Sequence, residues 1–179
     1  KTRHKTMKLH PSLLTFLLLI ASSPTPAMAG SANANLNVSV SVVPSITISP
    51  PAPVQLGEYN PVATPYNPAT PVTATAPIAV TLPSNNTGKI TLGQGQNPAP
   101  VSTDPNPVRR MTDGNGNYLL YELYQDESKT TIWGNTDETG LSLTGTGSPS
   151  NVNVHVKIPA GQNVPAGNYQ DTVQLKVTL

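Results

Sequence analysis

Residues 152–158 read Val-Asn-Val-His-Val-Lys-Ile and alternate strictly between apolar and polar side chains. Successive side chains of an extended chain point to opposite faces, so this pattern predicts a strand with one buried face. The alternation recurs at residues 35–43, which read Asn-Leu-Asn-Val-Ser-Val-Ser-Val-Val, and between residues 169 and 179. These strands, and the lack of a helical period after residue 30, predict an all-β domain.

Shorter apolar runs lie between these strands. Residues 78–82 and 89–92 flank a turn cluster and are expected to form a hairpin. Residues 57–77, rich in Pro, Ala and Thr, are expected to be a long surface connection. Further short strands are expected at 46–48, 118–124 and 141–143. Roughly seven strands separated by turns favour an immunoglobulin-like β-sandwich.

The N-terminal residues have the features of a secretory signal peptide. Four basic residues in the first eight positions precede an apolar run at 13–21, which is too short to span a bilayer comfortably. Ala27-Met28-Ala29 is a small-x-small site, so we expect cleavage after Ala29, with a cut after Ala34 as the alternative. The other interpretation of this segment is a membrane anchor.

Cleavage would change the charge of the chain. Loss of four of the ten Lys and Arg leaves six against nine Asp and Glu, a net charge of −3. A chain with this balance has no basic patch to neutralise phosphates, so nucleic-acid binding is not expected. Cysteine is absent, which excludes disulfides, thiol catalysis and thiolate metal sites.

The remaining residues suggest no catalytic or metal site. His155 is the only histidine beyond residue 29, and its place on the polar face of a strand predicts a solvated side chain. Asp113, Asn115 and Asn117 resemble the start of a calcium loop, but the sixth and twelfth positions are Tyr118 and Tyr124 instead of Gly and Glu. A hairpin turn is therefore expected there. No cofactor, no metal and no enzymatic activity are expected.

Two further charged groups have an alternative functional interpretation. The acidic pairs 126–127 and 137–138 could serve glycosidase chemistry, but in a polar region with few aromatic residues solvated loop charges are expected. Arg109 and Arg110 could hold an anion, but a structural role at the start of a strand is expected.

Several motifs, in their order along the chain, resemble those of the spore coat protein U domain family. Archaic, Csu-type chaperone–usher pilins contain the same domain. The resemblance covers the chain after the signal peptide and is carried by Leu56-Gly-Glu-Tyr59, Arg109-Arg-Met-Thr112, Tyr118-Leu-x-Tyr-x-Leu-Tyr-x-Asp126, Thr131-x-Trp-Gly134, Pro159-x-Gly-Gln162 and Ala166-Gly-Asn-Tyr-x-Asp-Thr-Val173.

The resemblance implies an incomplete immunoglobulin-like sandwich that is completed by a strand donated from another subunit. It implies identical or related pilin subunits, a periplasmic chaperone and an outer-membrane usher as partners, in a surface fibre that supports adhesion and biofilm formation. A spore coat or matrix protein that needs no usher is the first alternative. A secreted carbohydrate-binding or hydrolytic sandwich is the second.

Residues 30–44 are predicted to be the donor segment, and residues 45–179 the sandwich domain. Four apolar side chains on one face of the segment, Leu36, Val38, Val40 and Val42, are the candidate subunit-binding residues. Pro44 ends the strand because proline cannot donate to a ladder. If the segment stayed with its own domain, it would be an edge strand.

Three predictions concern the core. Tyr121 and Trp133 are expected to be core residues and not ligand contacts. The family commonly has two cysteines that align with Ile46 and Leu82, so these two side chains are expected to touch across the sandwich.

Overall fold

The computed structural model describes residues 35–49, 51–62 and 70–179, in two compact units that divide after Val40. The predicted signal peptide, residues 1–29, and residues 30–34 of the predicted donor segment lie outside the described residues. In the first unit, residues 35–40 take part in no strand pairing.

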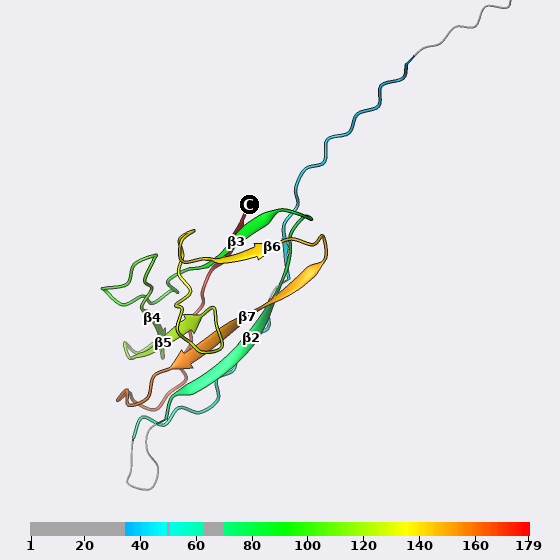
Figure 1. The fold of residues 1–179 in the computed structure, drawn as a ribbon. Helices are drawn as coiled ribbons and strands as arrows, with labels where there is room; N and C mark the ends of the chain where they lie inside the picture. The colour runs from blue at the N-terminus through cyan, green and yellow to red at the C-terminus, as the bar shows by residue number, and fades with distance from the viewer. Residues whose placement is uncertain (1–34, 50, 63–69) are drawn as a thin grey trace, which may run out of the picture. The chain divides into compact units, whose positions relative to one another are not determined.

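The second unit consists of two antiparallel sheets (Figure 1). The larger sheet has the order β1-β2-β7-β5-β4 and the smaller has the order β6-β3-β8. The described ranges contain no helix, so the all-β prediction is confirmed. The strands are β1 (Thr47–Ile48), β2 (Val72–Thr81), β3 (Thr87–Leu92), β4 (Arg109–Thr112), β5 (Tyr118–Tyr124), β6 (Leu141–Thr144), β7 (Pro149–Ile158) and β8 (Leu175–Thr178).

β2 and β7 form the longest ladder of the molecule, from Val72↔Ile158 to Thr81↔Pro149 (Figure 1). Alternate residues on both strands face inward, as the sequence pattern requires. Together with inward side chains of β3 and β5 they make the core, whose most buried aliphatic members are Val80, Leu82 and Ile90.

The expected hairpin of residues 78–82 and 89–92 is wrong, because β2 and β3 lie in different sheets. Strands that lie in opposite sheets can still direct their apolar residues into the same core, as β2 and β3 do. The turn between them packs on the turn between β6 and β7: Asn85 N donates to Gly145 O at 3.1 Å, and Gly145 N donates to Asn86 O at 2.7 Å. A Cβ at Gly145 would collide with the Pro83 carbonyl, so glycine permits this close approach.

Two strand boundaries also differ from the predictions. β2 begins at Val72, inside the stretch predicted to be a surface connection, because Val72 to Ala76 alternate and pair with β7. The strand predicted over 169–179 is divided: Gln170 bridges to Thr112 beside β4, and Leu175–Thr178 pairs with β3 in the other sheet.

Candidate subunit-binding site

The predicted donor residues are almost fully exposed. Leu36, Val38, Val40 and Val42 are 85–88% exposed, and none of them takes part in strand pairing among the described residues. An extended run of exposed apolar side chains on one face costs free energy in water, and it is the form in which strand-adding peptides bind a sheet edge.

The second feature of the site is the outer edge of β8. β8 pairs with β3 on one side and is the last strand of its sheet in the described chain. Gly93 N donates to Gln174 O at 2.8 Å, so residue 174 and alternate residues after it direct their backbone groups towards β3. The N–H and C=O groups of Leu175 and Val177 therefore point to the outer edge.

The core beneath this edge is only partly closed. Leu175 and Val177 face the core but are half-buried, and Leu179 is 50% exposed. By comparison, Ile78 and Val80 of β2 and the inward residues of β7 from Val152 to Ile158 are 0–7% exposed. The apolar side chains are thus well covered along β7 and the last part of β2, and incompletely covered along β8.

The edge of β4 differs from that of β8 because a loop covers it. Arg110 donates from Nε to Asn97 O at 3.1 Å and from Nη2 to Pro98 O at 2.7 Å, and its guanidinium lies 4.0 Å from the ring centroid of Tyr118. Covering an edge in this way prevents another strand from pairing with it.

The prediction that Trp133 and Tyr121 are core residues is confirmed, because these side chains are 0% and 5% exposed. Trp133 Nε1 donates to Ile90 O at 2.7 Å, which ties the loop after β5 to β3. Tyr121 Oη donates to Asp171 Oδ2 at 2.6 Å, just before β8. Burial and then this hydrogen bond raise the pKa of Tyr121.

Arg109 has the structural role that the sequence predicts. It is fully buried and donates to three backbone carbonyls: Gly93 at 2.8 Å, Leu92 at 2.8 Å and Trp133 at 2.7 Å. Burial lowers the pKa of Arg109 to about 10, while Tyr121 and Asp171 act in the opposite direction. Arg109, Tyr121 and Trp133 together link the two sheets near the start of β8.

His155 is not solvated, so that prediction is wrong. It is 8% exposed, its Nδ1 lies 3.0 Å from Thr75 Oγ1, and it pairs in register with Thr75 and Tyr124. β7 is a central strand, so side chains of β2 and β5 flank it even on the outer face. Alternation shows which face a residue lies on, but not how its neighbours cover it.

The expected turn at residues 113–117 is present. Asp113 Oδ1 accepts from Asn115 N at 2.8 Å, and Asp113 Oδ2 accepts from Asn117 Nδ2 at 2.8 Å. These hydrogen bonds, the one from Asn117 first, lower the pKa of Asp113. Within the described ranges no three His, Cys, Asp or Glu side chains gather as metal ligands would.

The acidic pairs also lie in loops. Asp126 accepts hydrogen bonds from Ser128 and from Thr131 N and Thr130 N, which lower its pKa, and it closes its own turn.

Among the described residues, no helix has the length and apolarity needed to cross a membrane.

Ile46 and Leu82 lie one residue beyond the paired ends of β1 and β2, which are neighbours in one sheet, and not on opposite sheets as expected. The register Thr47↔Thr81, extended by one residue, puts Ile46 opposite Leu82. Ser49 N donates to Ala79 O at 3.0 Å, which makes 49/79 and 47/81 hydrogen-bonded pairs and 46/82 a non-hydrogen-bonded pair.

These strands, in two antiparallel sheets in which no described strand pairs with the outer edge of β8, define an immunoglobulin-like sandwich domain with an open edge. The chain belongs to the Spore Coat Protein U domain family, which it matches over residues 32–176. It is 40% identical over 127 residues to Protein U of Myxococcus xanthus, which covers 70% of this chain and 71% of that protein.

A solved structure shares the fold. It is a chain of the CsuC–CsuE chaperone–tip adhesion subunit pre-assembly complex from the archaic chaperone–usher Csu pili of Acinetobacter baumannii, with a TM-score of 0.50 and 23% identity. The match covers 77% of this chain and 40% of that chain, so this chain spans less than half the length of the solved one.

Proposed function

We propose that this protein is a non-enzymatic structural subunit of a chaperone–usher surface fibre, in which residues 35–43 of one subunit pair with the outer edge of β8 in the next. The observation that carries the proposal is the presence of both halves of such a contact in one chain. The segment has four apolar side chains 85–88% exposed, and no described strand pairs with the outer edge of β8, which lies above half-buried apolar residues.

The energetics favour this contact. Burial of four such side chains contributes about 1.5–3 kcal/mol each, so about 6–12 kcal/mol in all, before backbone hydrogen bonds are counted. Leu175 and Val177 offer those hydrogen bonds along the open edge. Before assembly the same edge and apolar face would be an aggregation hazard, which is why the proposal includes a periplasmic chaperone as partner.

The remaining parts of the proposal rest on the family and on the solved pilus complex. A subunit of this kind would be secreted through the periplasm, delivered to an outer-membrane usher and polymerised with identical or related subunits at the cell surface. There the fibre would support adhesion and biofilm formation.

The test compares charge on the two faces of the donor segment. Val40→Asp puts a carboxylate among the apolar side chains. Ser39→Asp puts the same charge on the neighbouring residue, whose side chain lies on the opposite, polar face of the segment. We expect oligomers that resist detergent without heating from the wild type and Ser39→Asp, and monomers from Val40→Asp. Oligomers of normal length from Val40→Asp would refute strand donation by this segment.

A second candidate function is a spore coat or matrix protein that assembles without an usher. The 40% identity to Protein U of Myxococcus xanthus, within a family named after a spore coat protein, favours it. Export of the gene product in a host with and without the chaperone and usher separates the two: a fibre subunit reaches the surface only in their presence.

A further inference from the structure

The β1–β2 ladder stops at a point where backbone donors are missing. Thr47 pairs with Thr81 and Ile48 with Val80, and among the described residues Ser49 N to Ala79 O is the last backbone hydrogen bond of this ladder. Residues 49, 51 and 53 would therefore direct their N–H groups to β2, and residues 79, 77 and 75 theirs to β1. The next positions in this series are Pro51, Pro53 and Pro77.

Three of the four N–H groups needed to continue the ladder are therefore absent, since proline has none. Only Thr75 keeps its donor. Accordingly, residues 51–55 run beside β2 and make no backbone hydrogen bond to it. We call residues 51–55 the strap.

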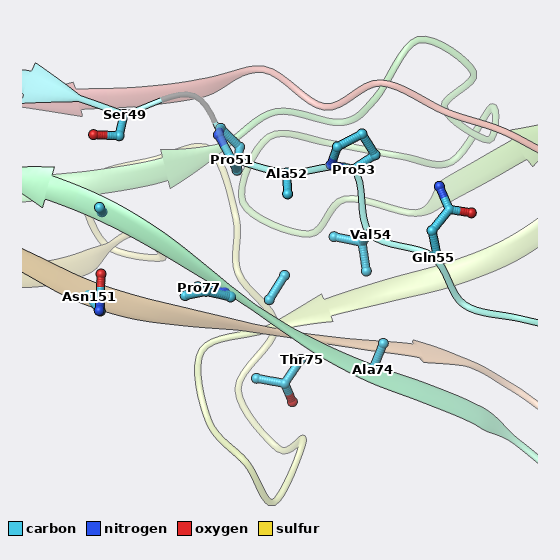
Figure 2. Close-up of a pocket in the computed structure, with 12 residues that line it drawn as sticks. Ser49, Pro51, Ala52, Pro53, Val54, Gln55, Ala74, Thr75, Pro77 and Asn151 are labelled. Carbon is cyan, nitrogen blue, oxygen red and sulfur yellow. The ribbon is translucent and has the colours of Figure 1, made fainter.

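A cavity of about 360 Å³ separates the strap from β2. Figure 2 shows the strap residues on one side of it and β2 residues, including Thr75 and Pro77, on the other. Pro77 thus has two effects: it lies in the part of β2 that does not pair with β1, where proline interrupts pairing, and it lies under a segment that covers this side of β2.

We infer that Pro51, Pro53 and Pro77 close this edge of the five-stranded sheet to strand addition, so that a donated strand is not accepted beside β2. The inference rests on the proposed function, because it concerns which edge accepts the donor. A donor segment with a plain alternating pattern pairs with any regular open edge, and edge selection must then come from the acceptor.

Replacement of all three prolines by valine restores the missing donors. The strap then either pairs with β2 and presents a regular outer edge of its own, or moves aside and exposes β2. Both outcomes create an additional edge that a strand can join, so the expected result does not depend on which occurs.

The test is a titration of a labelled peptide of residues 35–43 onto the full chain carrying Val40→Asp, which keeps its own segment out of β8. We expect Pro51→Val/Pro53→Val/Pro77→Val to bind about one peptide per subunit more than this parent. Pro100→Val, at an exposed turn proline, is the matched control and should bind as the parent does. Pro77→Val alone serves if the triple variant does not fold, and shielding of Trp133 from iodide reports folding.

Equal peptide binding by the parent and the proline variants would overturn the inference. Failure of the proposed function would give a different result, because the parent itself would then bind no peptide. In either case, the difference in peptide bound per subunit between the parent and the proline variant shows whether the prolines close the edge.

Discussion

Single buried side chains hold the two sheets together near the start of β8. Trp133 and Arg109 donate hydrogen bonds to β3 of the smaller sheet, and Tyr121 donates one to Asp171 in the segment before β8. The burial of the two aromatic residues could be predicted from the sequence. Tyr121 shares a strand face with Leu119 and Leu123, and Trp133 follows Ile132 in an otherwise polar stretch. The three carbonyl acceptors of Arg109 could not be predicted, because they lie in segments 16–24 residues away in sequence.

Trp133→Ala should destabilise the domain by about 3–5 kcal/mol, because it leaves a large cavity and removes the donor to Ile90 O. Trp133 is the only tryptophan, so its fluorescence reports one site. Denaturant unfolding gives the loss of stability, and iodide should not quench the native protein. Free access of iodide to Trp133 would contradict its assignment to the core.

Tyr121 makes stability depend on alkaline pH. Its pKa is raised above the ordinary value of 10.0 in the folded state, chiefly by burial, so the folded chain keeps the proton that the unfolded chain loses. This contribution is fully present below pH 10 and decreases as the pH rises above it. We expect the Tm of the wild type to fall more steeply above pH 10 than that of Tyr121→Phe, and parallel pH profiles would disprove the effect.

The elements show where sequence periodicity is sufficient and where it is not. Alternation locates β5, β6 and β7, because each has a buried and a less buried face in a single sheet. It does not show which sheet a strand joins, which is why residues 78–82 and 89–92 were predicted to pair with each other. It also extends the last strand too far, because the chain changes sheets between Gln170 and Leu175.

The position of β1 gives a test at the level of one strand pair. Residues of a non-hydrogen-bonded antiparallel pair have Cα atoms about 4.5 Å apart, within the range that a disulfide spans. Ile46→Cys/Leu82→Cys should therefore cross-link spontaneously in an oxidising compartment and stabilise the domain by about 2–4 kcal/mol. Thr47→Cys/Leu82→Cys, which puts the two thiols on opposite faces, is the control. Free thiols in the first variant would show that β1 has a different register.

At the scale of the whole molecule, the sandwich and its family follow from the sequence, but the identity of the accepting edge does not. The alternation of residues 35–43 predicts a strand that needs a partner, and the exposure of its four apolar side chains agrees with that need. The partner edge depends on sheet order, and sheet order depends on contacts between distant residues. The sequence also does not show that Pro51, Pro53 and Pro77 belong to one ladder, because this depends on the register of β1 with β2.

The most direct measurement of strand donation is hydrogen exchange at the individual amides of β8, in monomer and in fibre. In the monomer, Lys176 and Thr178 bond to β3 and should exchange slowly, while Leu175 and Val177, on the open edge, should exchange fast. In the fibre we expect Leu175 and Val177 to become as protected as their neighbours, because the donated strand pairs with them. Fast exchange of Leu175 and Val177 in assembled fibres would contradict the account, since the outer edge of β8 would then remain unpaired.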